Sequence, residues 1–460
     1  MDVDQLMDGD TLSRDEADRL RNDRRRELWK RAEERMGALY GEEPPLPVLN
    51  RFLVERDALH RTDAVILFDV LARVSREARQ RRKGFSAGGA VCFVSWLLGA
   101  TEVNPLAPHY RCPKCRRTEF HPEAADGWDL PVKACECGGQ MILDGHDIPA
   151  ETCILGGANA YEFFRCETDA DFLGEAERII LTCGEELYSM EKYHEDGSED
   201  VLRTPKGVPV TDPETGKPIP VRTLPMASLM FLPKKKAKIR KPERISGPTG
   251  LVNWGRRTGQ PTIVLLGGFY GPHYLSEPSP FGSFPDELAR QDVMERALGD
   301  YLKYGGSEAE AVSDMKLPDP ALFSGRLTFS LFISVLCAAN NLYMDSGPEE
   351  LAEKAGFSGF AEMPLSMEDL WRMIARSTAY PGYMSGAAGE ILRNTGSGRY
   401  AGDPRQGFGE RDKRLFREMN LPDWFGTYAS GILRLCWRSE CVDLGIRLLE
   451  DARRKIRDGK

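Results

Sequence analysis

The chain has 460 residues and a formal net charge of −9, with 41% hydrophobic and 29% charged residues. This composition excludes an intrinsically disordered chain, and the length allows roughly three domains. Because the net charge is negative, any nucleic-acid binding must depend on local clusters of basic residues.

The sequence offers no candidate for a membrane-spanning or secretory segment. No apolar run reaches the roughly 18 residues needed to cross a bilayer. The acidic start, Met1 to Asp10, lacks the basic-then-apolar order of a signal peptide. We therefore expect no membrane partner and a cytoplasmic location. Eleven cysteines in such a chain favour reduced thiols or a metal site over a disulfide framework.

Local patterns predict the following elements in chain order. Residues 11–39 combine a capping signal with good helix formers, which predicts a helix whose arginines face solvent rather than nucleic acid. A second helix is predicted for residues 62–82, and the apolar run 90–98 fits either a buried strand or a buried helix. Residues 193–224 predict an exposed hairpin. The chain beyond about residue 286 is mostly helical in pattern.

A metal site is predicted from four cysteines in two close pairs: Cys112, Cys115, Cys135 and Cys137. Two such pairs on tight turns can close a tetrahedral four-thiolate zinc site, which is structural because all four positions are filled by protein. The second pair has one intervening residue instead of two, so His121 or His146 is an alternative ligand. Thiols without metal are the other interpretation.

Distinctive stretches surround these cysteines: Thr101 to Tyr110, Asp129-Leu130-Pro131, and Asp144 to Pro149. Together with the cysteine pairs, they resemble the zinc-bearing palm segment of PolC-type bacterial DNA polymerase III alpha subunits, and the similarity is dense over residues 84–152. Weaker similarity follows in the same order at Thr249-Gly250, Arg257 to Gln260, the helix near Val293 to Leu302, and Glu418 to Trp424.

The resemblance implies an α+β fold limited to the palm-to-fingers core of that family. A nucleotidyltransferase-like palm would carry an inserted four-cysteine zinc module, next to a mostly helical thumb and fingers region. The implied parts are a charged helical arm at 1–48, a palm and thumb-like region at 49–330 that contains the zinc module at 106–148 and the hairpin at 193–224, and a helical fingers-like region at 331–460.

The resemblance also implies candidate catalytic acids. Polymerisation needs two divalent ions bridged by carboxylates, and acids at i and i+2 on one strand point to the same face. Glu167 and Asp169 match the family's Asp-x-Asp pair, and Asp286 matches the third acid; together they would bind Mg²⁺ only in an active enzyme. Alternatively, Thr168 and Asp171 have capping-box spacing, and the acids then favour a helix N-terminus.

Three nucleotide-handling motifs of the family are altered here. The loop Gly-Ser-Arg-Gly-Ser-Val-Gly-Ser-Ser corresponds to Gly84 to Cys92, which lacks the arginine and most hydroxyls. The histidine of Thr-Gly-Gln-His is replaced by Pro261. The fingers motif Pro-Lys-Ala-His-Ala falls at Arg438 to Val442, where serine replaces lysine and Glu440 would repel phosphate. These losses predict a degenerate enzyme.

A dense basic segment is the candidate contact with DNA. Seven basic side chains lie within the eleven residues from Lys234 to Arg244, and two more follow beside Trp254. Such density can track a phosphate backbone, and the tryptophan can stack on an unpaired base; a solvated loop is the alternative. The residues are Lys234, Lys235, Lys236, Lys238, Arg240, Lys241, Arg244, Arg256 and Arg257.

Three functional hypotheses follow. The leading one is a catalytically degenerate PolC-like relative that binds primer-template or single-stranded DNA, or a replication protein. The second is an active, metal-dependent DNA polymerase, and the third is a protein-interaction scaffold without DNA binding.

Overall fold

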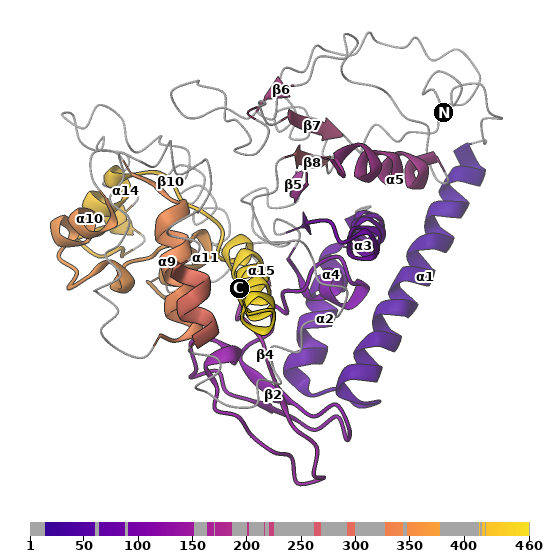
Figure 1. Cartoon of the computed structure of the whole chain (residues 1–460), viewed down its shortest axis with the longest axis horizontal. Coiled ribbons are helices and arrows are strands. Elements are labelled where there is room, and N and C mark those ends of the chain that lie inside the picture. The colour runs from indigo at the N-terminus through magenta and orange to yellow at the C-terminus, as the bar shows by residue number, and fades with distance from the viewer. Residues whose placement is uncertain are drawn as a thin grey trace.

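The computed structural model describes residues 14–59, 64–87, 91–150, 163–169, 171–185, 200–201, 216, 220–224, 262–267, 292–299, 327–343, 347–377, 414, 416–418 and 420–459. Their buried apolar side chains form three clusters. We call the corresponding parts the N-terminal body, the cysteine module (residues 106–148) and the C-terminal body (Figure 1).

The N-terminal body begins with helices whose apolar residues recur at helical spacing. They are α1 (Arg14–Tyr40), α2 (Leu46–Leu59), α3 (Ala64–Arg81) and α4 (Phe93–Leu98). Helix α1 buries a single stripe of side chains four residues apart, at Leu28, Ala32, Met36 and Tyr40. Because such positions share one helix face, α1 packs against α3 and α4 along this stripe.

Two arginines of α1 bind within the protein. Arg24 and Arg31 reach the buried carboxylate of Asp69 on α3, with N–O distances of 2.5 and 2.8 Å. Arg73 on α3 contacts the same carboxylate at 3.2 Å. The guanidinium groups of Arg24 and Arg31 therefore fix α1 on α3.

The apolar run 90–98 is a buried helix where the structure describes it. Cys92 and Ser95 form a reciprocal capping box at the start of α4, and Gly99 ends the helix with a left-handed φ of 83°. A β-carbon is strained in that backbone conformation, which favours glycine.

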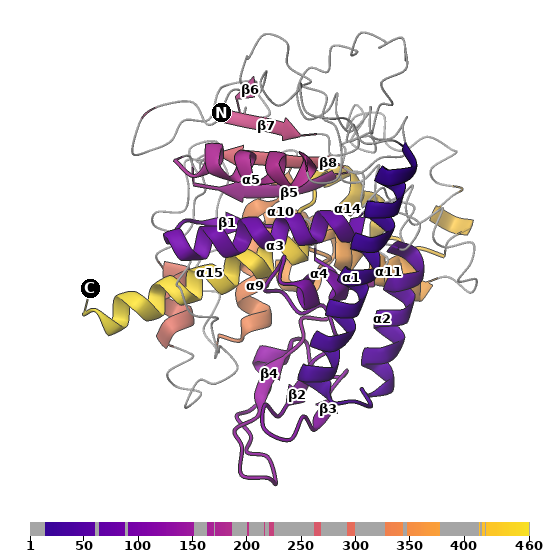
Figure 2. The ribbon, with the colours of Figure 1, turned by 90° about the vertical axis from the view of Figure 1, so that its right-hand side faces the viewer.

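A five-stranded sheet lies beside these helices, with the order β1-β5-β8-β7-β6. Its strands are β1 (Phe85–Ser86), β5 (Phe163–Thr168), β6 (Asp200–Val201), β7 (Pro220–Leu224) and β8 (Thr262–Gly267). Strands β5 and β8 are parallel, and the other pairs are antiparallel. A parallel pair needs a crossover connection, and the crossover contains α5 (Leu173–Glu185), which packs against β8 and α3 (Figure 2).

The cysteine module is a small antiparallel sheet with the order β3-β2-β4. Its elements are β2 (His109–Arg111), β3 (Thr118–Phe120), β4 (Ile142–Asp144) and the short helix η3 (Gly127–Asp129). Tyr110, Leu130, Met141 and Leu143 pack with Cys112 and Cys135 as its core.

The C-terminal body is mainly helical. It contains the helical residues 292–299 together with α9 (Phe329–Asn340), β9 (Leu342–Tyr343), α10 (Pro348–Ala355), η8 (Phe360–Glu362), α11 (Met367–Ser377), α14 (Phe425–Gly431), β10 (Ile432–Arg434) and α15 (Arg438–Arg457). Helix α15 packs against α9 and α11. It runs between α9 and the helices of the N-terminal body (Figure 1).

The mixture of helices and small sheets agrees with the expected α+β class, whereas a nucleotidyltransferase palm and the part boundaries at 48 and 330 stay predictions. Among the described residues, no helix combines the length and apolar character needed to cross a bilayer.

Candidate functional site

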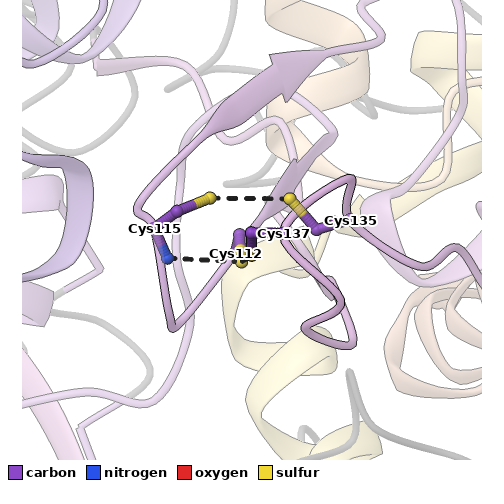
Figure 3. A group of neighbouring side chains, drawn as sticks. All are labelled: Cys112, Cys115, Cys135 and Cys137. Carbon is purple, nitrogen blue, oxygen red and sulfur yellow. Dashed lines mark hydrogen bonds between the residues drawn. The ribbon is translucent and has the colours of Figure 1, made fainter.

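The four predicted cysteines meet in space. Their sulfur atoms all lie within 4.8 Å of one another. The Cys112 and Cys137 sulfurs are 3.5 Å apart, as are those of Cys115 and Cys135. Figure 3 shows the two loops facing each other, with the Cys115 and Cys135 sulfurs turned toward one another.

Tight turns aim these side chains inward. In the first loop, the Cys112 N–H donates to the Arg117 carbonyl and the Arg116 N–H donates to the Cys112 carbonyl, both at 2.9 Å. In the second, the Gly138 N–H donates to the Cys135 carbonyl at 2.8 Å, and Gly138 has a φ of 75°. A β-carbon on Gly139 would lie 3.2 Å from the Cys112 sulfur. Two glycines thus let the shortened second pair close on the first.

This arrangement fits a zinc ion. Two sulfurs bound to one zinc at about 2.3 Å in tetrahedral geometry are about 3.8 Å apart, close to the observed 3.5 Å separations. His146 contacts the Asp126 carboxylate at 3.1 Å, and His121 contacts Glu123 at 2.9 Å. Among the described residues, the candidate ligands at this site are therefore the four cysteines, and neither His121 nor His146 belongs to the cluster.

The electrostatics of the cluster favour one thiolate before metal binds. The Cys115 backbone N–H donates to the Cys112 sulfur at 3.5 Å and lowers the pKa of the Cys112 thiol to about 6. The Arg117 backbone N–H lowers the pKa of Cys115, but the surrounding sulfurs outweigh it and raise that pKa. Since zinc binds thiolates, the ion would complete the deprotonation that Cys112 begins.

The two segments that the resemblance assigns to nucleotide handling lie side by side. Strand β1 pairs with the end of β5, placing Ser86 opposite Glu167 and Phe85 opposite Thr168. Glu167 lies in β5, and Asp169 directly follows the strand. The Thr168 hydroxyl donates to the Gly84 carbonyl at 2.9 Å. Helix α5 begins only at Leu173, so Thr168 ends a strand and does not form the capping box that its spacing allows.

The Asp169 carboxylate is bound by backbone. It is buried and accepts a hydrogen bond from the Gly84 N–H at 2.9 Å, while the Asp169 N–H donates to the Gly84 carbonyl at 3.2 Å. Asp171 points elsewhere and pairs with Lys83. This acid therefore joins β1 to the end of β5.

Two residues of α15, Asp443 and Arg447, lie beside strand β1, a contact that the sequence did not predict. The buried Ser86 hydroxyl donates to the buried Asp443 carboxylate. Arg447, one helical turn later, donates to Asp443 through Nε at 3.1 Å. Two charged residues four apart on an otherwise buried helix face predict an ion pair such as Asp443–Arg447. The sequence does not predict that Ser86 of β1 contacts this pair.

The remaining predicted site residues are not tested by the structure. Asp286 lies outside the described residues, as do all nine candidate DNA-binding residues from Lys234 to Arg257. Of the three candidate acids, the structure therefore describes Glu167 and Asp169, which lie at the end of β5 and directly after it.

Part of this chain is homologous to DNA polymerase III PolC-type proteins. The protein of that name from Pediococcus pentosaceus is 39% identical over 116 residues, covering 24% of this chain and 8% of that relative. The Ureaplasma parvum protein is 37% identical over 109 residues, and the Staphylococcus aureus protein is 36% identical over 109 residues. In both cases 23% of this chain and 8% of the relative are covered. No family model matches the chain.

Proposed function

We propose that this protein is a PolC-like polymerase relative that has lost nucleotide addition and binds primer-template DNA. In this proposal the five-stranded sheet and α5 belong to a nucleotidyltransferase-like palm, the cysteine module is its structural zinc insert, and the C-terminal body contains the fingers-like part. The partial homology to DNA polymerase III PolC-type proteins supports the relationship.

The contact between Ser86 and Asp443 is the observation that supports the proposed loss of catalysis. By resemblance, Ser86 belongs to the loop that would hold the triphosphate. Its hydroxyl instead donates a hydrogen bond to the buried carboxylate of Asp443. A carboxylate repels a triphosphate. The Asp169 carboxylate, at a metal-ligand position of the family, is occupied by the Gly84 N–H. Both contacts favour packing over nucleotide binding.

One observation favours an active polymerase instead. Glu167 lies within β5 and Asp169 directly after it, which is close to the strand arrangement that two-metal sites use. In that case Glu167, Asp169 and Asp286 would hold Mg²⁺. Primer extension by the purified chain, with Mg²⁺ or Mn²⁺, decides between the two. We expect no extension above a no-protein control; extension that Asp169→Ala abolishes would replace the proposal with the active enzyme.

DNA binding is tested by titrating the protein against fluorescent primer-template at several salt concentrations. Because each neutralised phosphate releases counterions, the affinity should fall steeply as salt rises. Replacing Lys234, Lys235 and Lys236 by glutamine should weaken binding and flatten the salt dependence.

A charge-matched control is available on the described surface. Arg26, Lys30 and Arg457 have side chains that are 77%, 77% and 74% exposed, so their replacement by glutamine removes the same charge elsewhere. We expect that variant to bind nearly as the wild type does. No binding by the wild type even at low salt would favour the protein-interaction scaffold, and equal loss in both variants would reject the Lys234–Lys236 contact.

A further inference from the structure

A second group of cysteines lies in the core of the C-terminal body. The sulfurs of Cys337, Cys436 and Cys441 all lie within 4.8 Å of one another, and all three residues are buried. The Cys436 and Cys441 sulfurs are 3.7 Å apart. They come from three segments: the last turn of α9, the residues before α15, and the first turn of α15.

The backbone around Cys436 is held firmly. Its N–H donates to the side-chain oxygen of the buried Asn341 at 2.7 Å, and its carbonyl accepts from the Met367 N–H at 2.9 Å. The Asn341 amide also donates to the Leu365 carbonyl at 2.9 Å. Hydrogen bonds within the protein thus fix the loop that carries Cys436 to the end of α9 and to the start of α11.

We propose that Cys337, Cys436 and Cys441 form a second metal site, which binds a thiophilic ion, Zn²⁺ or Cu⁺, through three thiolates. Two sulfurs that share a metal at about 2.3 Å are about 3.8 Å apart in tetrahedral geometry and about 4.0 Å apart in trigonal geometry. The separation of 3.7 Å between Cys436 and Cys441 matches a shared ion.

The chemistry of the three thiols agrees with this assignment. Hydrogen bonding with the side chains of Cys337 and Cys436 lowers the pKa of the Cys441 thiol to about 6, while burial raises the pKa of Cys436. All three thiols are buried in the apolar core of the C-terminal body. A bound ion would displace the thiol protons and compensate part of the charge of the three thiolates.

Two further features favour anionic sulfur at this position. Cys441 lies in the first turn of α15, a helix of 20 residues whose dipole favours negative charge at this end. The first two N–H groups of the helix, those of Arg438 and Ser439, donate to the Glu368 carboxylate. Arg438 is buried at the same helix start. Burial lowers the pKa of Arg438, but the charges of Asp369, Asp126 and Cys337 raise it overall. Its guanidinium thus stays charged beside the sulfurs, whereas Glu368 and Glu440 act in the opposite direction on Cys441.

The ligand set limits the choice of ion. Soft thiolates select Cu⁺ or Zn²⁺ over Mg²⁺ and Ca²⁺. Three sulfurs suit trigonal Cu⁺, whereas Zn²⁺ would need a fourth donor. The Leu365 carbonyl oxygen, 3.5 Å from the Cys436 sulfur, is the nearest oxygen that the described contacts offer.

Metal counting on the full-length protein tests the site. The protein is reduced and stripped of metal without oxygen, Zn²⁺ or Cu⁺ is added, unbound metal is removed, and bound metal is measured by elemental mass spectrometry. Cys112→Ser/Cys137→Ser disables the cysteine module. We expect this variant to keep about one equivalent of Zn²⁺ or Cu⁺, and the further change Cys441→Ala to remove it. The ion retained in an equimolar mixture identifies the preferred metal.

A matched control and a second measurement separate the site from general effects. Cys166 is a buried cysteine of β5 outside both clusters, so Cys166→Ala should leave the count unchanged. If Cys441→Ala does not fold, X-ray absorption of the Cys112→Ser/Cys137→Ser variant decides, with about three sulfurs at about 2.3 Å expected. No retained metal, an oxygen or nitrogen shell, or a disulfide between Cys436 and Cys441 in the reduced preparation would overturn the proposal.

Discussion

The Asp169 carboxylate accepts a hydrogen bond from the Gly84 N–H, and the two backbones are joined by a second hydrogen bond in the opposite direction. Because both groups are buried in this contact, removing the carboxylate leaves the Gly84 N–H without its acceptor. An unsatisfied buried donor typically costs 1–3 kcal/mol, roughly, in folding free energy.

We therefore expect Asp169→Ala to lower the free energy of unfolding by about 1–3 kcal/mol, measured by urea denaturation. Asp169→Asn keeps an acceptor oxygen and should lose less. Asp171→Ala is the control, because that side chain is 66% exposed and should change stability by less than about 0.5 kcal/mol. Unchanged stability in Asp169→Ala would contradict the structural role of this carboxylate.

His109 of the cysteine module is linked to α1 by a hydrogen bond with Tyr40. Its Nδ1 lies 2.7 Å from the Ala107 carbonyl oxygen, so it carries the proton, and Nε2 accepts from the Tyr40 hydroxyl at 3.2 Å. Burial lowers the pKa of His109 from its usual 6.5, an effect that the charge of Asp144 opposes. The folded state thus holds this imidazole neutral.

A pH dependence of stability follows from that shift. In the window between the lowered pKa and 6.5, the unfolded state binds the proton more readily than the folded state. The stability contribution of His109 is therefore present above pH 6.5 and is lost as the pH falls, with a slope of at most about 1.4 kcal/mol per pH unit. Urea denaturation from pH 7.5 downward should show a shallower decline for His109→Gln than for the wild type; parallel curves would exclude this role.

At the scale of elements, α15 approaches α9 closely through a glycine in the C-terminal body. A β-carbon on Gly445 of α15 would lie 2.6 Å from Ile333 Cδ1 and 3.1 Å from Phe332 Cε1, both on α9. Such distances force side chains on α9 to move. Gly37 of α1 offers the matched control, because a β-carbon there would meet nothing within 4 Å.

We expect Gly445→Ala to lower the free energy of unfolding by about 1–3 kcal/mol through overpacking. Gly37→Ala should instead be neutral or raise it by up to about 1 kcal/mol, since alanine is the better helix former. Thermal and urea denaturation of both variants give the comparison. Equal behaviour of the two variants would mean that α15 does not pack closely on α9.

Elements that depend on local sequence were predicted well. The helix expected at 11–39 is α1 at Arg14–Tyr40, and the one expected at 62–82 is α3 at Ala64–Arg81. The four-cysteine cluster was also predicted, because the two pairs carry their own turn residues. In each case the deciding interactions lie within a few tens of residues.

Contacts between distant segments were not predicted. Thr168 ends a strand because β5 pairs with β1 and β8, and that tertiary pairing overrides a local capping pattern. The cluster at Cys337, Cys436 and Cys441 depends on how α9 and α15 pack, which no spacing rule in the sequence records. The same holds for the contact between Ser86 and Asp443.

For the molecule as a whole, the cysteine module connects the other two parts. On one side, Arg51 of α2 donates to the carbonyl of Ile148, the last residue of the module, at 2.8 Å. On the other, Asp129 accepts from the Phe329 N–H at 2.6 Å and from the Ser330 N–H at 3.2 Å. Phe329 and Ser330 are the first residues of α9. The module thus supplies an N-terminal cap to a helix of the C-terminal body.

If zinc stabilises the module, loss of the ion should weaken the hydrogen bonds that Asp129 accepts at the start of α9. The first N–H groups of a helix have no partner within the helix, so the protection of the Phe329 and Ser330 amides depends on Asp129. In Cys112→Ser/Cys137→Ser, which leaves the second cysteine cluster intact, we expect hydrogen exchange to accelerate in β2, β3 and β4 and at the start of α9. Amides of α3 should keep their protection, because α3 is buried by α1, α4 and α5. Faster exchange everywhere would indicate global unfolding, and unchanged exchange at Phe329 and Ser330 would show that the module holds its shape without the ion.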